Sequence, residues 1–234
     1  MSLQAVTCGA CGGAVAMEIG AEAPACLFCG AQTLTREEIP EEVEPPGGVI
    51  PFTVDEAGAD EAFRTFAKSS FWYPSDIRNA RLDLKPLLLP AWVWSGEIET
   101  HFAGLVRSAT RSGKRPVAGQ ETLHLTGVLV PSSTALTRAE LAAVSPFDCS
   151  GEAPFDPDDV EVPYELGMLT RSAATEEALA AMRQVHTGRI KSSMGASTLN
   201  TSCLYSSLDG RPLLLPIYIG AYRRGESYYR VVIN

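Results

Sequence analysis

Several features that many enzymes rely on are scarce or missing in this sequence. The 234 residues include three histidines, His101, His124 and His186. No Walker A loop, GxGxxG, GxSxG or HExxH motif occurs in the chain. The sequence therefore offers no constellation of residues that argues for an enzyme, and we expect a protein without catalytic activity.

Segments that direct a chain to a membrane are missing as well. The chain begins Met1-Ser2-Leu3-Gln4, without the basic and apolar stretches of a signal peptide. No apolar run approaches the roughly 20 residues that a membrane-spanning helix needs. We expect a soluble, cytoplasmic protein. The chain stops on the apolar stretch 228–234, which suggests a fragment of a longer protein or an exposed end.

Positive charge is absent where a nucleic-acid-binding segment needs it. Residues 1–35 contain no Lys, Arg or His, and residues 37–61 hold nine acids and no base. Those nine acids equal the whole net charge of −9. Because affinity for phosphates comes mainly from Lys and Arg, we expect a protein partner and no nucleic acid. The alternative to a protein that docks other proteins is a nucleic-acid-binding zinc-ribbon module.

The sequence does contain two CxxC pairs, Cys8 with Cys11 and Cys26 with Cys29. Two residues between cysteines let both thiolates reach one tetrahedral ion, and a glycine after each pair suits a tight turn. The pattern predicts a zinc ribbon in residues 1–35 with one structural Zn²⁺ on these four ligands. A redox role for either pair is the weaker alternative, because matched glycines fit a shared metal better.

The remaining residues predict an acidic Pro/Gly linker over 36–48 and a mainly antiparallel α+β domain over 49–234. Two capping boxes, Thr53–Glu56 and Thr137–Glu140, predict helices over about 54–70 and up to Val144. A further helix is expected from about Thr175 to Ile190, with an inward face made of Leu179, Met182, Val185 and Ile190. A strand over 198–207 then leads to a hairpin turn at Asp209-Gly210.

Pro-Leu-Leu-Leu-Pro occurs twice, at residues 86–90 and 212–216, each time after a basic residue. This repeat predicts two related helix-plus-strand halves, about 49–144 and 145–234. Each run is expected to enter a buried strand that follows a helix. Phe63, Phe66, Leu179 and Met182 are placed to cover the sheet.

Three other features leave alternatives open. Residues 107–119 carry four bases and no acid, which is typical of a solvated hairpin tip or of a site for a phosphate group or an acidic partner. Cys203 reads as a core thiol. An enzyme using His101, His124 or Cys149, the last with His186, is a second alternative to a protein that binds partners without catalysis.

The whole chain resembles a bacterial family of transcription-factor-IIB-type zinc-ribbon proteins. The resemblance rests on the CxxCG knuckles, on Val49-Ile50-Pro51-Phe52 and Leu89-Pro90-Ala91-Trp92, and on Leu215-Pro216-Ile217-Tyr218 before the C-terminal strand. Members are sometimes labelled primosomal helicases, a label that does not suit a chain without a nucleotide-binding loop. Some members carry an apolar membrane tail, which this sequence lacks, and are associated with membrane-stress proteins.

The sequence and this resemblance together predict a non-enzymatic zinc-ribbon adaptor or scaffold. Its ribbon is expected to dock protein partners. The resemblance implies a membrane-stress or membrane-remodelling assembly, with peripheral membrane association through those partners.

Overall fold

The computed structural model describes residues 3–39, 44–69, 75–78, 82–107, 113–158, 162–224 and 227–234. By contacts the chain divides into two compact units. Unit 1 comprises residues 1–91, 131–170 and 212–234, and unit 2 comprises residues 92–130 and 171–211. Residues 1–35 thus share a unit with residues 44–91, whereas the predicted division at a 36–48 linker stays a prediction.

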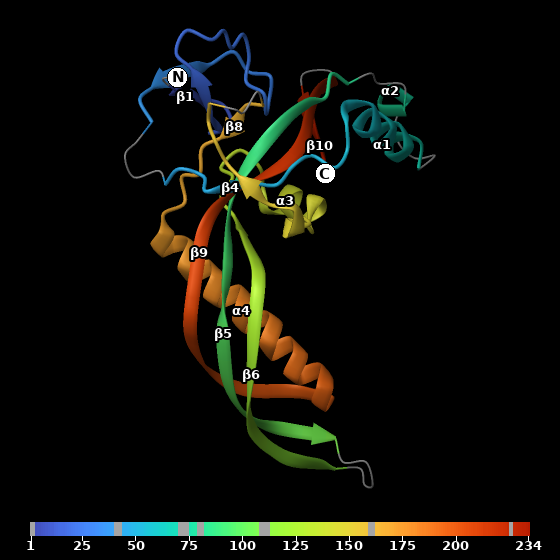
Figure 1. The fold of residues 1–234 in the computed structure, drawn as a ribbon. Coiled ribbons are helices and arrows are strands. Elements are labelled where there is room, and N and C mark those ends of the chain that lie inside the picture. Colours follow the sequence, from blue (N-terminus) through green and yellow to red (C-terminus); the bar gives the residue numbers. More distant parts are fainter. Residues whose placement is uncertain are drawn as a thin grey trace. The chain divides into compact units, whose positions relative to one another are not determined.

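The fold is a mixed α+β architecture built on a ten-stranded sheet (Figure 1). Its elements follow one another as β1 (Leu3–Cys8), β2 (Ala14–Glu18), β3 (Leu34–Glu37), β4 (Gly48–Val49), α1 (Glu56–Lys68), α2 (Ser75–Arg78), β5 (Lys85–Arg107), β6 (Lys114–Pro131), α3 (Arg138–Val144), η1 (Cys149–Gly151), β7 (Ala153–Pro154), β8 (Tyr164–Glu165), α4 (Arg171–Met194), β9 (Ala196–Arg224) and β10 (Ser227–Ile233). The strand order is β3-β1-β2-β8-β5-β9-β4-β7, with β10 beside β9 and β6 beside β5.

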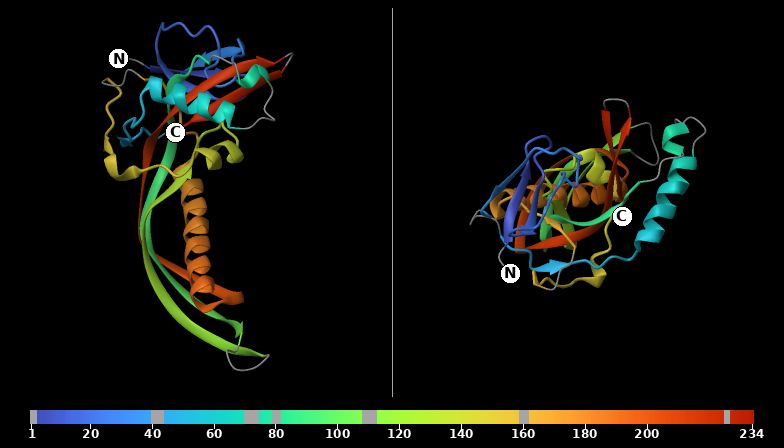
Figure 2. Two further views of the ribbon diagram at one scale, coloured as in Figure 1. Left: turned by 90° about the vertical axis from the view of Figure 1, so that its right-hand side faces the viewer. Right: turned by 90° about the horizontal axis from the view of Figure 1, so that it is seen from above.

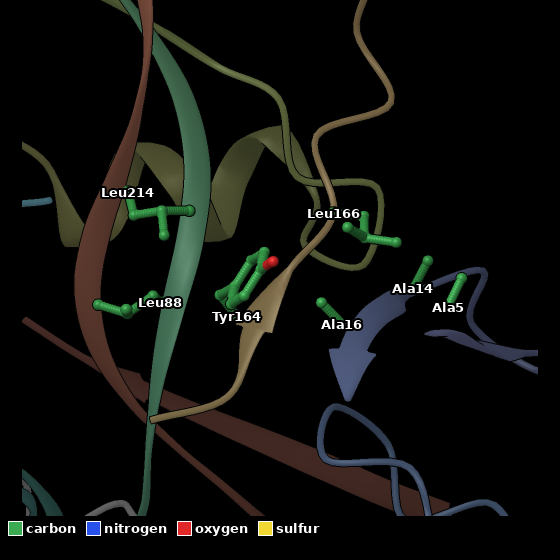
Figure 3. Close-up of a cluster of buried hydrophobic side chains, with 7 residues drawn as sticks. All are labelled: Ala5, Ala14, Ala16, Leu88, Tyr164, Leu166 and Leu214. Atoms are coloured by element: carbon green, nitrogen blue, oxygen red, sulfur yellow. The ribbon is translucent and has the colours of Figure 1, made fainter. Parts of the chain in front are cut away.

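In unit 1 the two Pro-Leu-Leu-Leu-Pro runs lie in neighbouring strands β5 and β9. Each run has a short parallel strand as a partner, since Leu88 is in register with Tyr164 of β8 and Leu214 with Val49 of β4. Leu88 and Leu214 belong to one buried cluster with Tyr164 and three alanines of β1 and β2, shown in Figure 3. The first run begins its strand as predicted, whereas the second lies inside the 29-residue strand β9.

Helix α1 packs on the hairpin of β9 and β10 in unit 1 (Figure 2). Ala59, Phe63 and Ala67 are its buried residues, which is the i, i+4 spacing of one helix face. Two expectations fail here. Phe66 is 55% exposed, and the helix is capped by Asp55, whose side chain accepts from Gly58 N, rather than by Thr53.

Helix α3 begins with the predicted capping box. Thr137 accepts a hydrogen bond from Glu140 N, and the Glu140 carboxylate accepts from Thr137 N at 2.7 Å. The same carboxylate forms an ion pair with Arg230 of β10, at 2.9 Å to Nε. One glutamate therefore both caps α3 and fastens it to β10.

In unit 2 strands β5, β6 and β9 run beside helix α4 (Figures 1 and 2). Strands β5 and β9 are antiparallel here, because Trp94 approaches Gly210 whereas the later Gly104 approaches the earlier Leu199. The β5–β6 hairpin that the sequence predicts is present. The loop predicted over 107–119 is shorter, because β5 extends to Arg107 and β6, which includes Arg115, begins at Lys114. The fourth base, Arg111, lies outside the described residues.

The predicted hairpin turn at Asp209-Gly210 is wrong, since β9 runs through it without a break. Gly210 is explained by a close approach instead. A Cβ atom at this position would lie 2.5 Å from ring atoms of Trp94, so only glycine fits under the indole.

Helix α4 is longer than expected, and the prediction of its buried face is confirmed for Met182 and Ile190 but wrong for Val185. Its buried residues Ala174, Ala178, Met182, His186 and Ile190 recur every four positions, whereas Val185, predicted to point inward, is 52% exposed.

Candidate metal centre

The four cysteines of the two CxxC pairs come from two matched turns in unit 1. Cys8 ends β1 and Cys11 follows in the next turn, while Cys26 and Cys29 lie between β2 and β3. Gly12 N donates to Cys8 O and Gly30 N donates to Cys26 O, both at 2.9 Å. Gly12 and Gly30 have φ of 77° and 72°, a left-handed conformation that glycine adopts without strain.

The four Sγ atoms lie within 4.8 Å of one another. Cys8 Sγ is 3.7 Å from Cys29 Sγ, and Cys11 Sγ is 3.7 Å from Cys26 Sγ. A tetrahedral zinc with Zn–S bonds of ~2.3 Å requires sulfur atoms about 3.8 Å apart. The closest pairs join one knuckle to the other, so these thiols can bind a single metal ion such as zinc.

The thiols differ in how readily they ionise. Burial opposes ionisation of Cys8, but the backbone N–H groups of Ala10 and Cys11 and the neighbouring thiols outweigh it and lower its pKa to about 7. Burial raises the pKa of Cys11 to about 11 and raises the pKa of Cys26 as well. Because the metal binds thiolates, its binding at neutral pH releases protons.

The first knuckle rests on the loop after β6. Gly13 has room for no side chain, because a Cβ atom there would lie 2.7 Å from the Phe28 ring and 2.8 Å from Ala135 Cβ. Phe28, which stands between Cys26 and Cys29, is fully buried. Thr134 Oγ1 donates to Gly12 O at 3.2 Å. The metal site is thus packed against residues far from it in the sequence.

A buried carboxylate, Glu165, organises this contact. Its Oε1 accepts from Thr134 N at 2.8 Å, from Ala135 N at 3.1 Å and from Thr134 Oγ1 at 3.1 Å. Glu165 is fully buried, and desolvation raises its pKa although these hydrogen bonds act in the opposite direction. On the other side β8 pairs with β2 of the ribbon, Glu165 opposite Val15.

Glu165 could not be recognised from the sequence, because nothing local distinguishes it from an exposed strand residue. Its role depends on three backbone and side-chain groups about 30 residues away. The flanking Tyr164 and Leu166, both buried, were the only available signal that this short strand lies inside the protein.

The three candidate histidines all lie in unit 2, two on strands and one on a helix. His101 and His124 are exposed, on β5 and β6, and His101 Nε2 contacts Glu99 Oε1 at 2.6 Å. His186 is fully buried on α4. Among the residues that the structure describes, the four cysteines form the one group of three or more potential metal ligands.

His186 belongs to a polar row that the sequence did not predict. Its Nδ1 lies 2.9 Å from Thr100 Oγ1 of β5, and its Nε2 lies 3.6 Å from Glu121 Oε1 of β6. Thr100 Oγ1 also lies 3.5 Å from Cys203 Sγ of β9. Thr100 and His186 are fully buried, so the row ties α4 to all three strands beneath it.

Cys149, the candidate nucleophile, lies in η1 of unit 1, whereas His186 lies in unit 2. Its Sγ is 3.9 Å from Phe147 O. Cys203 is half-buried on β9. The structure therefore places the two sequence candidates for a nucleophile and its base on different units.

A groove with a volume of about 540 Å³ opens beside the second knuckle, within unit 1. One wall consists of ribbon residues that include Val15, Met17, Pro24 and Leu27. The other wall comes from the start of β5 and from residues 219–221 of β9. The lining is mainly apolar, and Glu22, Asp83 and Lys85 are its charged members.

Comparisons of the chain with known protein families, with curated proteins and with solved structures found no match. No helix in the described part of the chain has the length and apolar character needed to span a membrane.

Proposed function

We propose that this protein is a non-enzymatic adaptor whose ribbon, held by one zinc ion, docks a protein partner. The observation that carries the proposal is the apolar groove along the second knuckle, because grooves of this size and character accept apolar side chains of a partner. Cys26 and Gly30 of the knuckle line the groove themselves. The metal would therefore shape the docking surface while taking no part in chemistry, since four thiolates complete its coordination.

Charge indicates the chemistry of the partner. Residues 1–35 contain no base, a zinc tetrathiolate carries net negative charge, and residues 37–61 add nine acids. At the groove, Lys85 is already paired with Asp83 at 2.9 Å. Complementary charge favours correct encounters and suppresses wrong partners. The groove is therefore suited to an apolar peptide segment flanked by Lys or Arg.

A displayed peptide library tests this proposal with the full chain as bait. We expect selection of apolar peptides with basic flanks, and loss of binding when zinc is removed by a chelator. Met17→Glu places a charge in the groove wall and is expected to weaken the selected peptides at least tenfold, about 1.4 kcal/mol.

Ile19→Glu is the matched control. Ile19 follows β2, is 66% exposed and does not line the groove. This variant should bind the selected peptides as the unchanged protein does, and both variants should keep their zinc. Binding that survives Met17→Glu and zinc removal alike would overturn the docking proposal.

The kinship to transcription-factor-IIB-type zinc-ribbon proteins is also a proposal, supported by the two knuckles and by the mixed α+β fold. A role at a membrane-stress or membrane-remodelling assembly rests on that resemblance alone. This role can be tested by crosslinking in cells and identifying the proteins that become attached at the groove. Partners confined to assemblies away from membranes would contradict it.

A duplication within residues 49–234 is supported by the order of the elements. β4, α1, β5 and β6 in the first half are matched by β8, α4, β9 and β10 in the second. Each half has a short strand, a helix, a long strand with the Pro-Leu-Leu-Leu-Pro run, and a returning strand. The two short strands also pair in parallel with the two runs at equivalent places, Leu88 and Leu214.

A further inference from the structure

Strand β9 has a free edge in unit 2. It pairs with β5 on one side, while its other described partners come later in the strand, β4 at Leu213 and Leu214 and β10 from Tyr218 onward. No described strand covers residues 198–206 on the side away from β5. An uncovered strand presents a row of unpaired N–H and C=O groups that can pair with another strand.

Residues 198–206 of this edge lack the devices that normally prevent such pairing. Residues 197–208 include no charged residue and no proline. The opposite edge of the same three strands, β6, carries Lys114, Arg115 and Pro116 and a glycine with φ of 69° at Gly127. Charge, proline and bulges are the usual protections of edge strands. One edge of unit 2 is therefore protected and the other is open.

Side-chain contacts with α4 and β5 already order this uncovered segment of β9. Leu199 is buried against Phe102 and Ile190, and Tyr205 is fixed under α4, where its hydroxyl donates to Leu179 O at 3.1 Å. Arg183 Nε donates to the same hydroxyl at 3.3 Å. These contacts fix Leu199 and Tyr205 on the α4 face of the strand, so pairing requires little further ordering.

We propose that residues 198–206 pair antiparallel with the same segment of a second copy of this chain, forming a two-fold dimer. A two-fold axis places each strand residue opposite its counterpart in an isologous interface. The segment is neutral, so the two copies bring no like charges together, which a copy of a charged strand would do. It offers no charge by which a foreign strand would be selected.

The register is limited by the point where the alternation of inward and exposed side chains along β9 is interrupted. Ser207 has φ of 53°, and the residues from Ser206 to Asp209 are all exposed, so the alternation of faces breaks there. The proposed overlap therefore ends at Ser206, and within it we centre the two-fold axis on Ser202, an exposed residue of the strand. This register sets Asn200 opposite Leu204, which is 60% exposed in the single chain.

The mass of the full, zinc-loaded chain in solution tests the proposal. Sedimentation or light scattering at micromolar concentration should give the mass of two chains. Ser202→Lys brings two lysines face to face at the axis and should give the mass of one chain. Ala103→Lys is the control, since Ala103 is exposed on the middle strand β5, and this variant should remain a dimer.

Hydrogen exchange locates the interface. The amides of residues 198–206 should exchange more slowly as the concentration of the unchanged protein rises, and those of Ser202→Lys should show no such dependence. A monomer at all concentrations would overturn the proposal, even one that captures a foreign strand. So would a dimer that survives Ser202→Lys with exchange at 198–206 independent of concentration.

Discussion

Leu88 and Leu214, each the middle residue of a Pro-Leu-Leu-Leu-Pro run, meet in one buried cluster on neighbouring strands (Figure 3). Their exposed fractions are 2% and 0%. Truncating a buried leucine removes its transfer free energy and leaves a cavity. We expect Leu88→Ala and Leu214→Ala each to lower the free energy of unfolding by about 2–5 kcal/mol, measured by denaturant titration.

The control for this pair is Ile19→Ala, because Ile19 is 66% exposed and lies in neither the groove nor the proposed dimer strand. It should change the free energy of unfolding by no more than about 0.5 kcal/mol. Since Leu88 and Leu214 share one cluster, the double variant should depart from the sum of the two single effects. Strict additivity, or a negligible cost at either leucine, would contradict the shared core.

Removal of the metal should affect more than the ribbon. Ala14 and Ala16 of β2 lie in the same cluster as Leu88, and β2 pairs with β8. We expect a chelator to accelerate hydrogen exchange at Tyr164 and Glu165 as well as in residues 3–37. An increase confined to the ribbon would contradict this expectation. It would mean that the pairing of β2 with β8 couples the ribbon only weakly to the rest of unit 1, and that segment 36–48 acts as the independent linker that the sequence predicts.

The sequence predicted best what depends on neighbouring residues. The cysteine knuckles need only CxxC spacing with a glycine after each pair, and the structure brings the four thiols together. The capping box Thr137–Glu140 is likewise local, and it is confirmed. Helix α1 was predicted within two residues of its observed bounds, although its cap is Asp55.

What the sequence missed depends on partners far along the chain. Asp209-Gly210 reads as a turn, but the glycine is there because the Trp94 ring, more than a hundred residues earlier, covers it. The i, i+4 series on α4 passes through His186, a polar residue whose burial depends on Thr100 of β5. No local pattern encodes either contact.

Glu165 predicts a specific dependence of stability on pH. Its pKa is raised in the folded protein by burial, so the folded state holds the proton more tightly than the unfolded state. This preference stabilises the fold at low pH and is lost as pH rises through the folded-state pKa. Glu165→Gln abolishes the titration and keeps an acceptor for Thr134 N and Ala135 N.

We therefore expect the stability of Glu165→Gln relative to the unchanged protein to increase as pH rises from about 4 toward neutrality. Taking the difference between the two proteins cancels the titration of the thiols, which both share. Denaturant titrations of both proteins across this pH range measure the difference in their free energies of unfolding. A difference that stays constant, or that decreases with pH, would refute the assignment.

The charge distribution predicts that the protein does not hold duplex DNA at physiological salt. Residues 1–35 have no base, and the acids of residues 37–61 repel phosphates. A gel-shift titration with the zinc-loaded protein should show no retained DNA. Retention with an affinity that falls steeply as salt is raised, as when several phosphates are neutralised, would favour the nucleic-acid-binding alternative.

The proposed zinc ribbon depends above all on one metal ion shared by Cys8, Cys11, Cys26 and Cys29. Elemental analysis of freshly purified protein, with native mass spectrometry on the same sample, measures it most directly. We predict one zinc per chain, lost on Cys26→Ser and retained on Cys203→Ser. Protein without zinc, protein with iron and sulfide, or zinc that survives Cys26→Ser would contradict the account.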